Sequence, residues 1–257
     1  MTGASLTRRL AIAAAFGCAM ELAIVLARQA ASEDALGLLS RGDQGELGSE
    51  SAVSAPDDAE GEPNRDWDLL QRRMRDIRAW LEVGKTPIDY PVMADRAGKG
   101  DQNSSYYLTH NAFGAPDAYG TPYLDARGEA NGSHALVYGH HATDSQHAMF
   151  SPIYRAFEPE RFARLGSAKW ETPDTEMVEL EPFCALRVDQ SYADIQRFSF
   201  DGQGAFRSWL EGILQEATAR ADKAGEQATR ASRCLTLVTC SDRQPGRRAR
   251  TLVLFTD

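Results

Sequence analysis

The hydrophobic and polar positions divide the chain into parts of different character. Residues 10–27 form an almost unbroken apolar run, LAIAAAFGCAMELAIVLA. Residues 32–65 are polar and acidic and contain no aromatic residue, so they bury too little apolar surface to offset the entropy of ordering. From residue 66 onward, apolar residues recur at helical spacing and then in short runs. The pattern predicts an apolar segment at 1–31, a flexible acidic stalk at 32–65 and a folded domain at 66–257.

The folded part is predicted to begin with a helix. In DWDLLQRRMRDIRAWLEV the apolar residues from Trp67 to Leu81 recur at helical spacing, and Asp66 is a suitable N-cap. Residues 157–165 and 206–218 also have helical spacing. Strand-like runs separated by turns follow Pro87: IDYPVM, SSYYLTH, TPYLDAR, SHALVYGH, TEMVELEPFCALRV, RCLTLVTC and RTLVLF. Many short strands with few helices indicate a mainly β (α+β) barrel or sandwich.

The N-terminal run has features of a membrane anchor. Arg8 and Arg9 precede it, and its length is close to the lower limit of about 17–25 residues for a spanning helix. Such arginines favour a cytoplasmic N-terminus, although Glu21 within the run is costly in hydrocarbon. A cleaved signal peptide is the alternative, but ARQA is a poor cleavage site. We therefore expect an uncleaved single-pass anchor at 1–31 in the cell membrane, with the folded domain outside the cell.

Composition excludes several classes of function. The chain has 257 residues with 28 Lys and Arg against 37 Asp and Glu, and a net charge of -9. Such an acidic chain is a poor candidate for binding nucleic acid, which needs a basic face. The 4 cysteines show neither a CxxC pair nor zinc-ligand spacing. Cys184 and Cys234 are interpreted as buried thiols, with a bridge between them left open.

The run LTLVTC at 235–240 carries candidate chemistry. It is strand-like, ends on Thr239 and Cys240, and meets the polar turn SDRQPG. A cysteine at the end of a barrel strand can lie exposed at the rim and act as a nucleophile when a neighbouring cation favours the thiolate. On this segment alone, a core cysteine at a strand end is the stronger interpretation.

The run ALVYGHH at 135–141 is a second apolar strand that ends in a polar corner. A histidine there can act as general acid or base, because its pKa lies near neutrality. A metal site is the alternative, but neighbouring side chains on a strand point to opposite faces, and Asp144 and His147 add no clear ligand spacing. The residues alone leave both His140 and His141 as candidates.

Three arginines, Arg247, Arg248 and Arg250, precede the apolar run at 251–255. An arginine at the start of a strand beside that of the cysteine can hold an oxyanion with its planar donor fork. A basic turn that balances local acids is the other interpretation. Composition does not choose among the three.

Together, TLVTC, LVYGHH and an arginine before the last strand resemble the sortase family of cysteine transpeptidases. PIDYPVMAD, YYLTHNAFG, TPYLDAR and YGHHATDSQHAMF resemble its class B branch. The resemblance covers about Trp67 to Asp257, and the order and spacing of its short motifs make it specific. It implies a closed β-barrel of about eight strands with an N-terminal helix and peripheral helices. It implies no cofactor and no metal.

Carried over residue by residue, the resemblance implies Cys240 as nucleophile, His140 as acid and base, and Arg250 as the oxyanion-binding residue, with Arg248 as runner-up. Asp242 resembles an acidic residue often found after the class B cysteine. The implied substrates are secreted proteins with an NPxTG-like C-terminal sorting signal. They would be cleaved through a thioacyl-enzyme and joined to a cell-wall amine. The helix at 206–218 fits the place of the class B substrate-recognition helix.

Other functions stay open at this point. A pilus-polymerising sortase, which uses a pilin lysine as acceptor, is the nearest. A non-catalytic surface binding protein on the same barrel is opposed by the intact set of Cys240, His140 and Arg250. A papain-like peptidase would place its cysteine before its histidine, the reverse of the order here. The expected partners are thus sorting-signal proteins, a cell-wall or pilin amine and, through the N-terminal helix, the membrane, with no nucleic acid.

Overall fold

The computed structural model describes residues 65–96, 106–142, 145–242 and 247–257. The chain separates into two compact units, Met1–Asp66 and Trp67–Asp257, and the second contains the helices and strands described below. The predicted anchor at 1–31 lies outside the described residues, as does the predicted stalk at 32–65 apart from Arg65.

The structure contradicts the predicted location in the cell membrane, which had a single span and an extracellular catalytic domain. Among the described residues, no helix has the length and apolar character needed to cross a bilayer. The longest of them, α4 (Gly202–Glu216), has 15 residues. At 1.5 Å per residue it reaches about 22 Å, against about 30 Å of hydrocarbon. The expected membrane partner rests on the segment at 1–31, which lies outside the described residues, so it stays a prediction.

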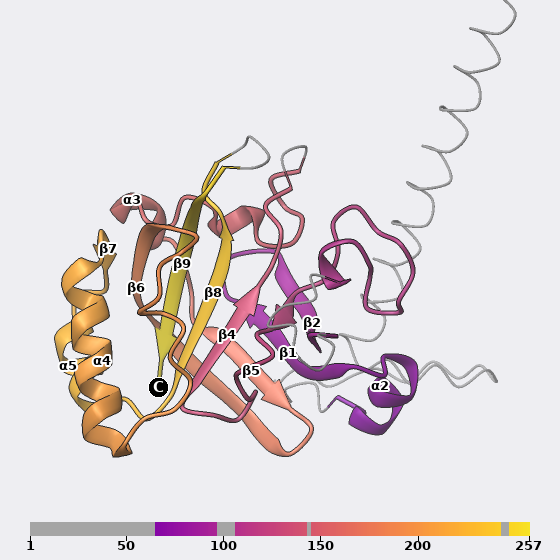
Figure 1. The fold of residues 1–257 in the computed structure, drawn as a ribbon, viewed down its shortest axis with the longest axis horizontal. Coiled ribbons are helices and arrows are strands. Elements are labelled where there is room, and N and C mark those ends of the chain that lie inside the picture. Colours follow the sequence, from indigo (N-terminus) through magenta and orange to yellow (C-terminus); the bar gives the residue numbers. More distant parts are fainter. Residues whose placement is uncertain (1–64, 97–105, 143–144, 243–246) are drawn as a thin grey trace, which may run out of the picture. The chain divides into compact units, whose positions relative to one another are not determined.

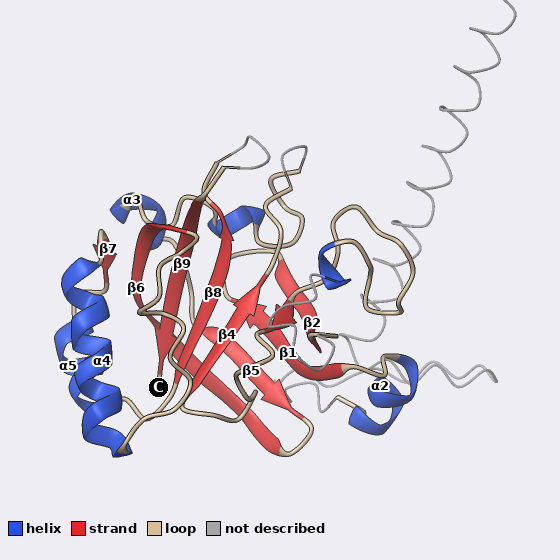
Figure 2. Ribbon diagram, viewed as in Figure 1, coloured by secondary structure: helices blue, strands red, loops and turns tan. Residues whose placement is uncertain are grey.

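The described elements include few helices and many strands (Figures 1 and 2). In chain order they are α2 (Trp67–Arg73), β1 (Ile77–Val83), β2 (Ile88–Ala94), η1 (Tyr106–Leu108), β3 (Tyr123–Leu124), β4 (His134–Tyr138), η2 (Ser151–Ile153), α3 (Pro159–Phe162), β5 (Ala168–Thr172), β6 (Thr175–Asp189), α4, β7 (Ala219–Arg220), α5 (Ala224–Arg230), β8 (Cys234–Cys240) and β9 (Ala249–Thr256).

Eight of these strands close into a barrel. They pair in the order β5-β1-β2-β3-β4-β8-β9-β6, and β6 pairs back to β5, while β7 adds to the outer edge of β6. The β2–β3 and β4–β8 pairs are parallel and the others are antiparallel, so the barrel is mixed. Closure pairs strand edges that would otherwise be open to other chains. The predicted mainly β, closed sortase-type barrel with peripheral helices is confirmed.

Side chains on β8 alternate between two cores. Leu235 and Leu237 pack inside the barrel, whereas Cys234 and Val238 pack on its outer face, against residues of α4 and α5. Figure 1 shows these two helices side by side against the outside of the barrel. By the same alternation, Cys240 at the end of β8 belongs to the outer face and does not enter the barrel core.

The helix predicted over the start of the domain is wrong in its second half. Helix α2 ends at Arg73, and strand β1 begins at Ile77. Strand β1 pairs with β2 on one side and β5 on the other, so its backbone hydrogen bonds are satisfied within the barrel. Its apolar positions are dense enough to fit a helix as well as a strand, and barrel pairing decides between them.

Candidate active site

Three strands bring the three candidate side chains to one rim of the barrel. Strands β4 and β8 are parallel, with Tyr138 opposite Val238, so both end at the same rim, where His140 and Cys240 lie. Strand β9 runs antiparallel to β8 and starts there, with Arg250 directly opposite Cys240. This rim is the upper end of the barrel in Figure 1. The Cys, His and Arg predicted from distant motifs are therefore neighbours.

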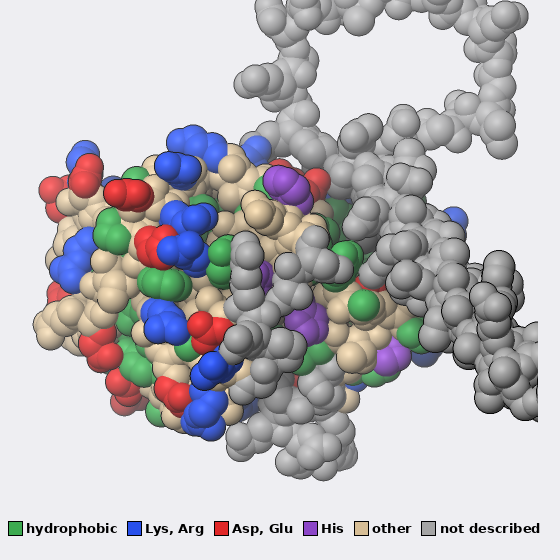
Figure 3. Space-filling model, turned by 90° about the horizontal axis from the view of Figure 1, so that it is seen from above, with side chains coloured by type: hydrophobic (Ala, Val, Ile, Leu, Met, Phe, Trp, Pro, Cys, Tyr) green, Lys and Arg blue, Asp and Glu red, His purple; other side chains and the backbone are tan. Residues whose placement is uncertain are grey.

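A cavity of about 410 Å³ collects these three side chains. Cys240, His140 and Arg250 are each half-buried in it. Figure 3 looks down on this end of the molecule, where histidine, basic and acidic side chains share the described surface. A thiol, an imidazole and a guanidinium in one cavity can perform acyl transfer. Its lining consists of Leu108, Tyr123, Arg127, Tyr138, Gly139, His140, Gln190, Gln196, Val238, Thr239, Cys240 and Arg250.

Cys240 is the described cysteine that can react. Its thiol is free and half-buried, whereas Cys184 and Cys234 are free and fully buried. Burial raises the pKa of Cys184 well above its ordinary value and the pKa of Cys234 to about 12. Those two thiols therefore stay protonated at neutral pH, and their interpretation as buried, unbridged thiols is confirmed.

The Gly139-His140 corner is held by backbone contacts. Gly139 N–H donates to the carbonyl of Val238 at 3.0 Å, and Phe150 N–H donates to the carbonyl of His140 at 2.9 Å. A Cβ on Gly139 would lie 2.6 Å from the ring of Phe150, so a glycine is needed here. His140 Nε2 lies 2.9 Å from the carbonyl of Leu108. Because a carbonyl only accepts, Nε2 carries the proton and Nδ1 is the basic nitrogen of the neutral ring.

The neighbouring histidines are placed differently. The ring of His141 stacks on Tyr154 with centroids 4.1 Å apart, and His141 does not line the cavity. His147 is exposed. Within the ranges that the structure describes, no group of three His, Cys, Asp or Glu residues is placed to hold a metal ion. The geometry thus favours His140 over His141 as the acid and base.

The structure also separates the candidate arginines. Arg250 donates from Nη1 to the carbonyls of Arg247 at 2.8 Å and Ala249 at 3.1 Å, and from Nη2 to Gln190 at 3.1 Å. Arg248 is instead bound to the carboxylate of Asp189 through two bonds of 2.9 and 2.7 Å. It is exposed and lies outside the cavity lining. The position of Arg250 therefore suits an oxyanion-binding role better.

Asp242, the acidic residue after the cysteine, is also outside the cavity lining. Its carboxylate pairs with Arg187 at 3.2 Å, where Arg187 is exposed and Asp242 is partly exposed. An exposed pair of this kind contributes little to stability, on the order of 0–1 kcal/mol. The described contacts give Asp242 a surface role beside the site.

An ion pair that was not expected from the sequence supplies Arg127 to the cavity lining. Asp125 is bound by Arg127 through Nε at 2.8 Å and Nη2 at 2.7 Å, and Tyr138 donates its hydroxyl to it at 2.9 Å. Burial alone raises the pKa of Asp125, but the bonds from Arg127 and Tyr138 outweigh it and leave that pKa below its ordinary value. The sequence feature that could have indicated this ion pair is the Asp and the Arg that follow the strand in TPYLDAR.

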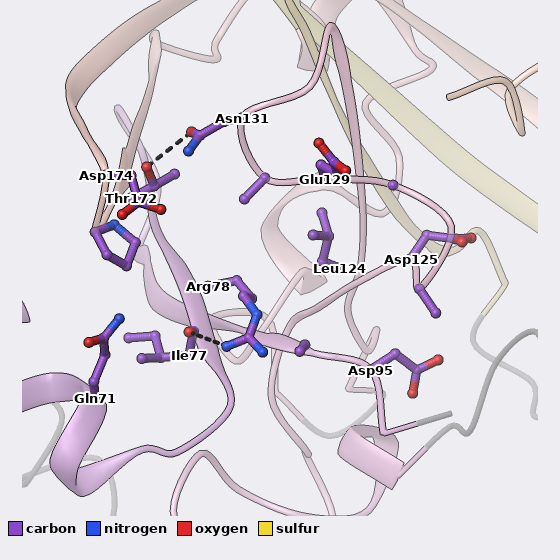
Figure 4. Close-up of a pocket in the computed structure, with 15 residues that line it drawn as sticks. Gln71, Ile77, Arg78, Asp95, Leu124, Asp125, Glu129, Asn131, Thr172 and Asp174 are labelled. Carbon is purple, nitrogen blue, oxygen red and sulfur yellow. Dashed lines mark hydrogen bonds between the residues drawn. The ribbon is translucent and has the colours of Figure 1, made fainter. Parts of the chain in front are cut away.

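A second cavity lies next to the first and has the opposite charge. Its volume is about 670 Å³, and the described residues that line it include four carboxylates and one arginine, Arg78 (Figure 4). Asp125 lines this second cavity, whereas Arg127 lines the first. The Asp125–Arg127 pair thus joins the acidic cavity to the basic one. The four carboxylates belong to Asp95, Asp125, Glu129 and Asp174.

A curated protein and a set of solved structures point to the same relationship. No family model matches the chain. The curated protein "Sortase B" of Listeria monocytogenes is 23% identical over 188 residues, which are 72% of this chain and 70% of that protein. The predicted resemblance to class B sortases is confirmed by this relative and by solved structures.

The fold is shared with several solved sortase B structures. That of Clostridium perfringens matches with a TM-score of 0.62 and 21% identity, covering 74% of this chain and 98% of that one. That of Staphylococcus aureus matches with a TM-score of 0.59 and 19% identity, covering 74% and 85%. That of B. anthracis in complex with AAEK1 matches with a TM-score of 0.59 and 22% identity, covering 75% and 83%.

Proposed function

We propose that this chain, which has the sequence pattern and fold of the class B sortases, is a cysteine transpeptidase with Cys240, His140 and Arg250 as its catalytic residues. The observation that carries the proposal is the cavity that all three side chains line, with Cys240 and Arg250 as direct cross-strand partners. The catalytic unit is residues 66–257, in agreement with the compact unit that begins at Trp67.

In the first half of the reaction, the Cys240 thiolate attacks the carbonyl carbon of a threonine in the sorting peptide. The negative charge that develops on the carbonyl oxygen is stabilised by the Arg250 guanidinium. His140 in its protonated form then gives a proton to the leaving amine, and the C–N bond breaks. The product is a thioester between Cys240 and the threonine, with the C-terminal peptide released.

In the second half, an amine attacks the thioester. His140, now neutral, removes a proton from the amine through Nδ1, and the Cys240 thiolate leaves. The new amide joins the sorted protein to the amine donor. We place this donor in the cell wall, and the sorted substrate in the class of secreted proteins with an NPxTG-like signal. The related sortase B of Staphylococcus aureus has been solved as a substrate complex.

A cleavage assay tests the proposal. A quenched-fluorophore peptide with an NPxTG-like motif should be cleaved by the wild-type chain, and a short amine should convert the hydrolysed product to a ligated one of higher mass. Cys240→Ala should abolish both products and the thioester seen by mass spectrometry. Cys184→Ala, which removes a buried thiol outside the cavity, is the matched control and should retain turnover. Equal turnover by Cys240→Ala would overturn the assignment.

A further inference from the structure

Two glutamines accept hydrogen bonds from the two arginines of the Cys240 cavity. Gln190 Oε1 accepts from Arg250 Nη2 at 3.1 Å, and Gln196 Oε1 accepts from Arg127 Nη1 at 2.9 Å. All four side chains line the cavity, and both glutamines come from the connection between β6 and α4. A glutamine amide oxygen is a neutral acceptor of the same kind as a peptide oxygen. Each glutamine amide oxygen therefore occupies a position in which the arginine can instead bind an oxygen of a peptide.

Arg127 is held rigidly for such a role. Two of its nitrogens bind Asp125, whose side chain is 0% exposed, and its guanidinium lies 5.1 Å from the ring centroid of Phe198. The bonds to Asp125 and Gln196 use three of its N–H groups. Of these acceptors Gln196 is neutral and lines the cavity, so its bond is the one that an oxygen of a bound peptide can replace. A preorganised arginine loses less entropy on binding an oxygen than a mobile one.

The charge of the cavity favours an anion. Its described lining contains Arg127, Arg250 and His140 and no carboxylate, although the chain as a whole carries a net charge of -9. Asp125 balances part of the Arg127 charge from outside this lining. A carboxylate binds a guanidinium more strongly than a neutral amide does, because both partners are charged. A carboxylate is therefore able to displace Gln196 from Arg127.

From these contacts we propose that Arg127 forms a second oxygen-binding subsite, separate from the oxyanion position at Arg250, which selects peptides carrying a carboxylate side chain near the scissile bond. The inference rests on the proposed function and adds a specificity to it. Arg127 acts here as a substrate-binding residue and takes no part in the chemical steps. Gln196 fills the subsite until the peptide arrives.

A scan of peptide pairs tests this subsite. Glutamate and its neutral isostere glutamine are placed in turn at each variable position around the scissile threonine, and binding to Cys240→Ala is measured by fluorescence anisotropy. At one position the glutamate peptide should bind about tenfold more tightly, as expected for a charge-assisted bond over a neutral one. In Cys240→Ala/Arg127→Gln, the ratio of the Kd of the glutamine peptide to the Kd of the glutamate peptide should fall to about one. An unchanged ratio in that variant would overturn the subsite.

Two further variants control for charge and folding. Arg248→Gln removes the same charge from an exposed arginine outside the lining, and the ratio should stay as in Cys240→Ala. If Arg248→Gln lost the preference for glutamate as fully as Arg127→Gln does, the preference would depend only on the net charge of the protein. That result would contradict the proposal. Arg127→Gln alone leaves the buried Asp125 carboxylate without its cation and can unfold the chain for that reason. In that case Asp125→Asn/Arg127→Gln, which removes both charges, is used in its place. Because binding is read in Cys240→Ala, failure of the proposed chemistry would appear separately, as no cleavage by the wild-type chain.

Discussion

Cys240 and Arg250 are direct partners across the antiparallel ladder of β8 and β9. Side chains of directly opposed residues lie on the same face of a sheet, with Cβ atoms about 4.5–5.5 Å apart. Arg250 is thus fixed beside the thiol by backbone pairing, and its guanidinium turns toward Gln190. Arg248 directly precedes the first residue of β9 and is bound to Asp189.

Arg250→Ala is expected to lower kcat/KM by about 10²–10³-fold, because an oxyanion donor is removed from the transition state. Arg248→Ala removes an equal charge from an exposed ion pair, and its effect should stay within about twofold. Peptide cleavage under kcat/KM conditions measures both variants. A larger loss in Arg248→Ala than in Arg250→Ala would move the catalytic role to Arg248.

His140→Ala is expected to lower kcat/KM by about 10²–10⁴-fold, since proton transfer to the leaving amine is lost. His141→Ala removes a ring stacked on Tyr154 and is expected to affect stability more than catalysis. Both variants are compared in the cleavage assay after their melting temperatures have been measured. The assignment of His140 fails if only the folded His141→Ala variant is inactive.

Gly139→Ala should destabilise the chain by about 1–3 kcal/mol, because the new methyl group overlaps the Phe150 ring beside the catalytic corner. Chemical denaturation measures the loss. Gly204→Ala is the matched control, since a Cβ there meets no atom within 4 Å, and it should be neutral or stabilising. If the clash is the cause, adding Phe150→Leu should reduce the cost of Gly139→Ala. Equal costs in both backgrounds would point to another cause.

The thiols should differ strongly in reactivity. A thiol-specific reagent added to the native chain at pH 8 should label Cys240 rapidly and leave Cys184 and Cys234 unlabelled, because burial raises the pKa of both. Peptide mass spectrometry locates the label. In denaturant, Cys184 and Cys234 should both react, as expected of thiols without a bridge. Failure of either to react there would indicate a disulfide.

Much of the barrel could be predicted from local patterns, and the reasons are visible in particular elements. LTLV and TLVLF are apolar runs bounded by polar turns, and they form β8 and β9. The run SSYYLTH has strand-forming residues, but its centre is the short helix η1, because no barrel strand pairs with it. Strand β5 was not predicted, since its AKWET sequence contains only two apolar residues, Ala168 and Trp170, and is too short for their alternation to stand out.

The site could be predicted only where its residues belong to motifs. Cys240, His140 and Arg250 each flank an apolar strand, and the family resemblance selected them. Arg127 and Gln196 are 69 positions apart in the chain and lie in connecting segments without periodicity. Their contact arises only when the connection after β6 packs against the segment that follows β3, which no local pattern indicates.

His134, at the start of β4 and outside the cavity lining, shows how a buried titratable group should affect stability. It is fully buried, with Nδ1 2.8 Å from the carbonyl of Arg197 and Nε2 2.9 Å from the hydroxyl of Thr236. The carbonyl only accepts, so Nδ1 carries the proton and Nε2 accepts from Thr236. Burial lowers the pKa of His134 from 6.5 to about 4, against the smaller opposing effects of the Arg197 bond and the Asp125 charge.

The unfolded chain therefore binds a proton at His134 at a higher pH than the folded chain does. The contribution of the neutral His134 to the free energy of unfolding is therefore fully present well above pH 6.5 and is lost as the pH falls toward 4. Between pH 7.5 and pH 5 the loss should be about 2 kcal/mol in the free energy of unfolding. Urea denaturation at both pH values measures it. His134→Gln should flatten this pH dependence by the same amount, whereas His147→Gln, which replaces an exposed histidine, should leave it as in the wild type. An equal slope in His134→Gln and the wild type would show that His134 does not titrate with a lowered pKa.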